Sequence, residues 1–196
     1  IRDRNAPIIG GGTGEVCTIN KSGFIETDET WESECIYVLN NKVVVPDGVT
    51  LTIEPGTIIK GTSGTGSLAS ALVVARGGKV LANGSASQPI VFTSTADDIT
   101  VGESNGTNLD QNDRGLWGGL VVLGYAPSSF AGDVDALQIE GIPAEDTWGL
   151  YGGDDPNDNS GVYKYLSIRH GGALIGEGHE INGLTLGGVG AGSARD

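Results

Sequence analysis

The chain has 196 residues, of which 34 are glycine, and its formal net charge at pH 7 is −14. This length supports one domain or at most two, with enough residues to bury a core. The negative charge disfavours nucleic acid and anionic membrane surfaces as partners, because both are bound through clustered lysine and arginine. No apolar run approaches the length of a membrane span, and no stretch has the pattern of an amphipathic helix.

The first 14 residues, IRDRNAPIIGGGTG, are charged and then glycine-rich, without a core of their own. We expect this leader to be either a flexible tail or a strand that pairs with another chain, so Ile1, Arg2, Ile8 and Ile9 are candidate assembly residues. The chain shows neither a starting Met nor a signal peptide, so Ile1 is interpreted as the start of a processed protein or of a fragment.

Residues 15–35 are polar and acidic and include two aromatic residues and both cysteines. We interpret this segment as a cap over the first coil of the fold described below. Cys17 and Cys35 are expected to form a disulfide that closes a short loop, worth about 3 kcal/mol, and a disulfide points to secretion. Two reduced, buried thiols are the alternative.

The stretch from Val43 to Gly61, VVVPDGVTLTIEPGTIIKG, organises the chain. Three very short β-branched runs alternate with Pro-Asp-Gly and Glu-Pro-Gly turns, which are strong turn signals. A chain that turns so often without alternating polar residues winds into coils, and one coil needs neighbours to bury its apolar side. The pattern predicts an all-β, right-handed parallel β-helix (a solenoid), with a β-sandwich as the alternative.

A motif of leucine, any residue, an aliphatic residue and a nearby glycine recurs along the chain. It begins at Leu51, Leu72, Leu120, Leu137, Leu166 and Leu184. The steps from Leu51 to Leu72, from Leu120 to Leu137 and from Leu166 to Leu184 are 21, 17 and 18 residues, which we interpret as one coil each.

The β-helix is expected over residues 36–196, interrupted by loop insertions. Polar loops are expected at residues 95–114, 128–135 and 143–161, and the last two coils at residues 162–172 and 181–190. No aromatic plug or helix follows the final coil. An uncapped coil favours aggregation, so we expect either further chain or another subunit to cover it.

Four blocks carry a resemblance to a known family: VPDGVTLTIEPGTIIKG, ALVVARGGKVLANGSASQPIVFTS, RGLWGGLVVLGYAP and SGVYKYLSIRHGGALIGEGHEINGLTLGGVGAGS. They resemble secreted β-helix proteins of marine and gut Bacteroidetes and marine gammaproteobacteria. These are usually lipoproteins or cell-surface proteins without an assigned function. The resemblance covers residues 37–193 and implies a right-handed parallel β-helix outside the cytoplasm. It implies no activity and no catalytic residue.

Candidate metal ligands gather in one acidic loop, whose oxygen donors suit Ca²⁺. They are Asp154, Asp155, Asn157, Asp158 and Asn159. The spacing departs from an EF-hand, and the alternative is a turn whose side chains bind their own backbone. A second acidic stretch has a weaker claim and contains Asp97, Asp98, Glu103, Asp110 and Asp113.

Trp117, Trp148 and Tyr151 are candidates for a sugar-binding platform, the alternative being aromatic residues packed over the coils. A polysaccharide lyase is a third hypothesis, based only on analogy of fold, with Arg76 or Arg169 as the base. No strand carboxylates converge on these cations, so we expect no catalytic site.

The sequence therefore predicts an extracellular structural protein, a β-helical rod whose copies stack head to tail into a filament or surface layer. The main alternative is a cell-surface carbohydrate-binding or adhesion module that contacts an extracellular polysaccharide. Ca²⁺ is the one expected cofactor.

Overall fold

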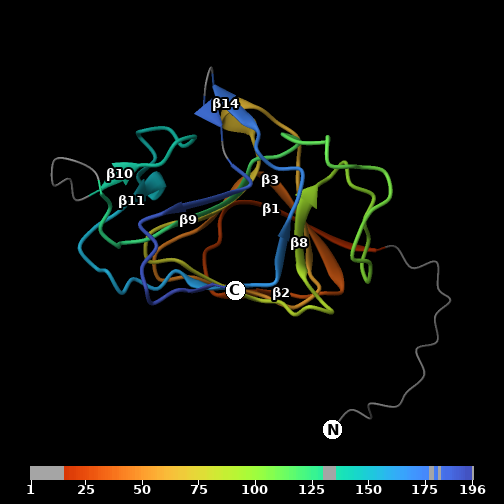
Figure 1. The fold of residues 1–196 in the computed structure, drawn as a ribbon, viewed down its shortest axis with the longest axis horizontal. Coiled ribbons are helices and arrows are strands. Elements are labelled where there is room, and N and C mark those ends of the chain that lie inside the picture. The colour runs from red at the N-terminus through yellow and green to blue at the C-terminus, as the bar shows by residue number, and fades with distance from the viewer. Residues whose placement is uncertain (1–15, 130–135, 177–178, 181, 196) are drawn as a thin grey trace, which may run out of the picture.

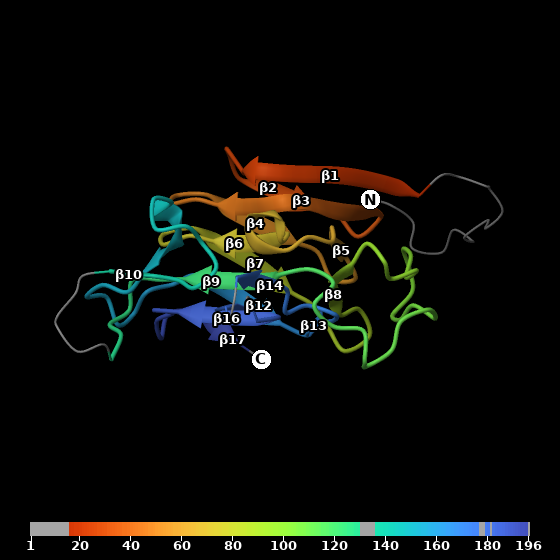
Figure 2. The same ribbon diagram turned by 90° about the horizontal axis from the view of Figure 1, so that it is seen from above.

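The chain winds through parallel strands that stack in three columns, which we call faces A, B and C. The computed structural model describes residues 16–129, 136–176, 179–180 and 182–195. Figure 1 looks along the stacking direction, and Figure 2 shows the coils lying one upon another, from β1 at one end to β17 at the other. The predicted all-β parallel β-helix is confirmed, while its handedness stays a prediction.

Each face has five levels, so the described chain forms five coils. Face A contains the first halves of β1 (Cys17–Phe24) and β3 (Cys35–Val45), then β5 (Ile58–Gly61), β8 (Ile90–Ser94) and β13 (Leu166–Ile168). Face B contains the second halves of β1 and β3, then β6 (Ala71–Val74), β9 (Gly119–Leu123) and β16 (Leu184–Gly187). Face C contains β2 (Glu29–Trp31), β4 (Thr50–Ile53), β7 (Lys79–Asn83), β12 (Gly161–Lys164) and β17 (Ala194–Arg195).

The corners between faces use residues that tolerate a left-handed backbone. Asn41, with φ of 67°, bends β3 from face A to face B. Gly48, with φ of 77°, closes the predicted Pro-Asp-Gly turn between faces B and C, and the amide of Val49 donates to the carbonyl of Pro46. Asparagine and glycine are the residues that adopt this conformation most readily, so the turn residues read from the sequence do form the corners.

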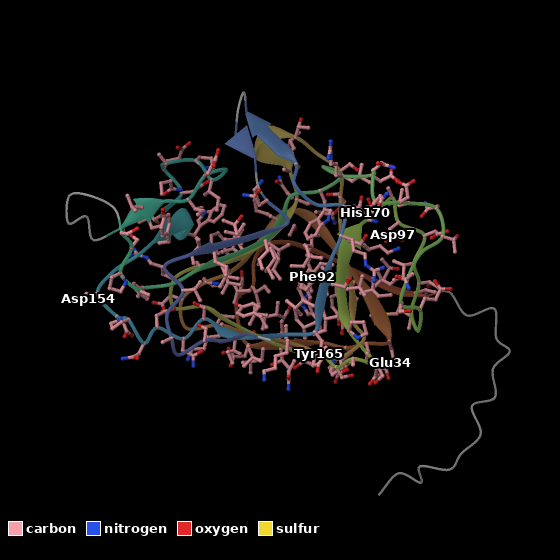
Figure 3. The ribbon with its side chains drawn as sticks, in the orientation of Figure 1. Glu34, Phe92, Asp97, Asp154, Tyr165 and His170 are labelled. Carbon is pink, nitrogen blue, oxygen red and sulfur yellow. A yellow bond between two sulfur atoms is a disulfide. The ribbon has the colours of Figure 1, made fainter. Side chains whose placement is uncertain are left out.

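The core fills the interior of the coils. On face B, Val43, Leu72 and Leu120 are aligned one above another and point inward, and each is at most 1% exposed. Residues at alternate positions point outward because side chains of a strand alternate between its two faces. Phe92 of β8 lies within the ring of strands (Figure 3) and is fully buried.

Two insertions cover the outer sides of faces A and B. Ile99, in the loop between β8 and β9, packs with outward-facing Ile36, Ile58 and Val91 on face A. Ile139 and Ile142, between β9 and β12, pack with outward-facing residues of face B. This second insertion contains β10 (Leu137–Gln138), the 3₁₀ turn η2 (Thr147–Gly149) and β11 (Leu150–Tyr151). The short elements η1 (Gly66–Leu68), β14 (Leu174–Gly176) and β15 (His179–Glu180) complete the described structure.

The prediction that each step between motifs is one coil is wrong, although the motif itself recurs on the strands. Leu72, Leu120 and Leu184 are equivalent positions on face B. Leu51, however, lies on face C, Leu166 on face A, and Leu137 in an antiparallel pair within an insertion. Every face buries alternate aliphatic residues, so the motif marks a strand of any face. The steps of 17 to 21 residues are therefore not single coils.

The segment expected to be a cap contributes a coil of its own. Its strands β1 and β2 pair in parallel with β3 and β4. The candidate assembly residues Ile1, Arg2, Ile8 and Ile9 lie outside the described residues.

Candidate functional site

The first coil closes the N-terminal end of the core with a charged pair. Lys21 is aligned with buried Leu39, and Glu29 with buried Leu51, so both side chains point inward. Their nearest charged atoms, Nζ and Oε1, are 2.7 Å apart, and the side chains are 25% and 29% exposed. Polar groups thus lie over the core on the outer side of the first described coil, where another coil would otherwise contact apolar side chains.

Two aromatic rings lie directly beneath this pair. The ring of Trp31 stacks on Tyr37 with centroids 4.7 Å apart, and its Nε1 donates to Oε1 of Glu29. The Lys21 ammonium is 6.0 Å from the Trp31 centroid, at the outer limit of a cation–π contact. We call the group Lys21, Glu29 and Trp31 the N-terminal plug.

The predicted disulfide between Cys17 and Cys35 is confirmed. The two residues are directly opposite each other in the register of β1 and β3, with Cα atoms 4.6 Å apart. The bridge therefore fastens the start of the outermost strand to the coil beneath it.

The last described coil presents apolar side chains at the opposite end. Leu184 and Leu186 are aligned with core residues Leu120 and Val122, so they point inward, yet they are 47% and 46% exposed. Partly buried Leu166, Ile168 and Val189 pack against the core beside them. We call Leu184, Leu186 and these three neighbours the C-terminal apolar face.

Charge reinforces the difference between the two ends. The strands of the last coil, β13, β16 and β17, contain no carboxylate, although the whole chain has 25 acidic residues. Apolar surface without like charges is the kind of surface on which a second β-coil stacks.

The acidic loop forms local turns. A carboxylate oxygen of Asp155 accepts from the amide of Asn157, and the side-chain oxygen of Asn159 accepts from the amide of Gly161. Asp158 is 5% exposed and accepts from the hydroxyl of Ser160. Asp154 lies at the edge of the molecule (Figure 3). In the described part of the chain no three His, Cys, Asp or Glu side chains gather as a metal-ligand set. Calcium binding by Asp154, Asp155, Asn157, Asp158 and Asn159 stays a prediction.

The second acidic stretch anchors the insertion over face A. The carboxylate of Asp97 accepts from the hydroxyl of Thr93 and the amide of Ile99, and the Asp97 carbonyl accepts from Lys60. The hydroxyl and amide of Thr107 hold the pKa of exposed Asp98 below its ordinary value.

The proposed aromatic platform is wrong for Trp117. This residue is fully buried in the core, and its Nε1 donates to the carbonyl of Arg169. Trp148 and Tyr151 are partly buried and pack over the outer side of face B, where Trp148 also meets Phe24 edge to face. Since the three side chains do not share a surface, they cannot stack together on one sugar chain.

The two arginines considered as the base of a lyase have different partners, and each is hydrogen-bonded to the fold. Arg76 donates to the carbonyl of Gly152 and lies over the ring of Tyr125, whereas Arg169 donates to Ser167 and to the carbonyl of Ser104. The N-terminal plug could not be predicted from the sequence, since inward-pointing charges cannot be recognised until the register is known.

One comparison with known proteins identifies a related family. The family model described as "Pectate-lyase like beta helix domain" matches residues 23–196, nearly the whole solenoid. No curated protein and no solved structure matches the chain. Among the described residues, no helix is both long and apolar enough to span a membrane.

Proposed function

The chain belongs to the pectate-lyase-like β-helix family, and from that premise we propose that it is an extracellular structural module that self-associates through its C-terminal apolar face. The observation that carries this proposal is the exposure of inward-pointing Leu184 and Leu186. A fully buried leucine contributes about 1.5–3 kcal/mol, so covering two half-exposed leucines gives a substantial driving force.

The partner in this proposal is a second copy, joined end to end through the same apolar face. Head-to-tail stacking, the geometry expected from the sequence, would press the N-terminal plug of one copy against the leucines of the next. Burying that charged pair against apolar side chains is costly, whereas leucine against leucine is favourable. A contact between two like ends is two-fold symmetric and closes as a pair. Self-association through the leader lies outside what the described residues support.

The extracellular location and the cell-surface or lipoprotein character belong to the same proposal. The disulfide supports an oxidising compartment, and the sequence blocks quoted above resemble exported proteins. Adhesion to a polysaccharide through the aromatic platform lacks support, because Trp117 is buried. For the lyase hypothesis, Arg76 and Arg169 are already hydrogen-bonded to other parts of the fold, and the family description alone assigns no chemistry.

Sedimentation equilibrium of the full 196-residue chain tests the proposal. The wild type is expected to form dimers at micromolar concentration. Leu184→Asp combined with Leu186→Asp should be monomeric, because charges on an edge strand prevent pairing. The matched control is Leu81→Asp, since Leu81 is 38% exposed on the outer side of face C. A monomeric wild type, or a dimer that survives the double substitution, would refute self-association through this face.

A further inference from the structure

Two adjoining cavities lie where face A turns toward face B, and they share Arg114 in their walls. The first, of about 430 Å³, is lined by Asp110, Asp113, Arg114, Arg169 and His170 among others. The second, of about 700 Å³, is lined by Thr65, Arg114, Asn182 and the backbone of several glycines. A ligand crossing Arg114 could therefore occupy both. Figure 3 places His170 beside Asp97 and on the opposite side of the molecule from Asp154.

The backbone at His170 is held in an unusual conformation. Its φ is +56°, a left-handed value that is uncommon outside glycine. The His170 carbonyl accepts from the amide of Leu116, and the amide of Gly115 donates to the carbonyl of Gly171. Such conformations persist where the surroundings impose them, and they cluster at functional sites. This turn fixes a titratable side chain in the wall of a cavity.

Two side chains in the wall of the first cavity, those of His170 and Arg169, are held by hydrogen bonds. Nδ1 of His170 is 2.5 Å from the carbonyl oxygen of Asp113, which in the neutral ring leaves Nε2 as an acceptor. Arg169 uses Nε and Nη2 on Ser167 and Ser104 and retains further N–H donors. Within the described residues the Arg114 side chain makes no hydrogen bond or ion pair. The carboxylates of Asp110 and Asp113 each accept one backbone amide and keep a second oxygen, so the site retains donors and acceptors for a ligand.

The mixture of charges decides the kind of ligand. The first cavity is lined by Arg114 and Arg169, but also by Asp97, Asp110 and Asp113, so its charges nearly cancel. A small anion would face three carboxylates, and a cation would face two guanidinium groups. The neighbouring hydroxyl groups of a sugar suit a cavity lined by both charges, because each hydroxyl can donate to a carboxylate and accept from an arginine.

We propose that these two cavities bind a neutral oligosaccharide across Arg114. Its hydroxyl groups accept from Arg114 and Arg169 and donate to the carboxylates of Asp110 and Asp113 and to His170. Amide side chains in the walls, including Asn105 and Gln111, extend the same hydrogen bonding. This inference is independent of self-association and uses none of the aromatic residues considered for a sugar platform.

Affinity electrophoresis tests the site. The full chain is run through native gels containing laminarin, arabinoxylan or galactomannan as neutral probes, and polygalacturonate as the anionic probe. Wild-type protein should be retarded by at least one neutral glycan, and Arg114→Ala should weaken that binding by about tenfold, the effect of losing a charged hydrogen bond. Lys79→Ala is the matched control, because it removes one exposed cation from face C and changes the net charge equally.

Three results would overturn the proposal: no retardation by any neutral glycan, retardation by polygalacturonate alone, or equal binding by wild type and Arg114→Ala. Because Arg114 is exposed, its substitution should leave the thermal unfolding midpoint unchanged. The sedimentation behaviour of Arg114→Ala should equal that of the wild type, which separates failure of this site from failure of self-association.

Discussion

The ammonium of Lys21 lies 2.7 Å from the carboxylate of Glu29, and both side chains point into the solenoid from its first coil. At the other end the inward-pointing positions are Leu184 and Leu186. Inward-pointing positions are thus charged in the first described coil and apolar and exposed in the last. In the proposed assembly, this asymmetry favours pairing through one end over polymerisation through both.

Removing the charges of the plug should therefore change the assembly. Lys21→Leu combined with Glu29→Gln gives the N-terminal end an apolar character, while Gln keeps an acceptor for the Trp31 N–H. We expect this variant to form concentration-dependent species larger than dimers, because both ends can then stack. Sedimentation velocity measures the size distribution. A distribution identical to that of the wild type would show that the plug does not limit assembly.

The two fully buried tryptophans should dominate stability. Trp117→Ala removes a large core side chain and leaves the Arg169 carbonyl without its donor, so we expect a loss of about 3–5 kcal/mol in the free energy of unfolding. Urea denaturation measures this value. Leu81→Ala, at an exposed position of face C, should cost no more than about 0.5 kcal/mol. Equal losses for the two variants would contradict the burial of Trp117.

The disulfide should stabilise the first coil. Cys17 and Cys35 are 18 residues apart, and in the loop-entropy model a bridge of this size contributes about 3 kcal/mol. The double substitution Cys17→Ser with Cys35→Ser should lower the free energy of unfolding by roughly that amount. Limited proteolysis should then cut residues 17–24 first, since β1 is an outermost strand. Unchanged stability and an uncut β1 would show that strand pairing alone fastens this coil.

Stability should fall in alkali because of two buried tyrosines. Burial raises the pKa of Tyr163, and nearby Asp158 adds to the effect. Burial also raises the pKa of Tyr37, against an opposing hydrogen bond from the Glu32 amide. A raised folded pKa means that the stabilisation is present in full below the unfolded value of about 10 and is lost as the pH rises above it.

Urea denaturation between pH 8 and 11 measures this dependence. Tyr163→Phe should show a shallower decline than the wild type above pH of about 10, the unfolded tyrosine value. Burial also lowers the pKa of Lys42. This shift makes stability rise with pH below the unfolded lysine pKa, opposite to the effect of the tyrosines. It affects the wild type and the variant equally, because both contain Lys42. Parallel curves for the two proteins would contradict the assigned role of Tyr163.

Much of the fold could be predicted because its signals are local. Pro46, Asp47 and Gly48 mark a corner through their own backbone preferences, and Cys17 and Cys35 are close in sequence. The phase could not be predicted, since Leu51 and Leu72 have the same local pattern but lie on different faces. Position within a coil depends on insertions whose length the local pattern does not encode.

The candidate site was harder to predict for the same reason. Trp117 has three glycines within two residues and follows a polar loop, which suggests a surface residue, yet it is buried just before β9 begins. The inward direction of Lys21 and Glu29 follows only from their register with Leu39 and Leu51. The cavity beside His170 was also out of reach, because it forms where an insertion distant in sequence brings Asp113 against the His170 ring.

Hydrogen exchange of the amides of β16, followed as a function of protein concentration, tests the central claim most directly. If two copies meet through the C-terminal apolar face, protection of residues 184–187 should rise with concentration, while that of β1 at the plugged end stays constant. The Leu184→Asp and Leu186→Asp double variant should show no such rise. Exchange in β16 that does not depend on concentration, or protection that appears at β1 instead, would contradict the account.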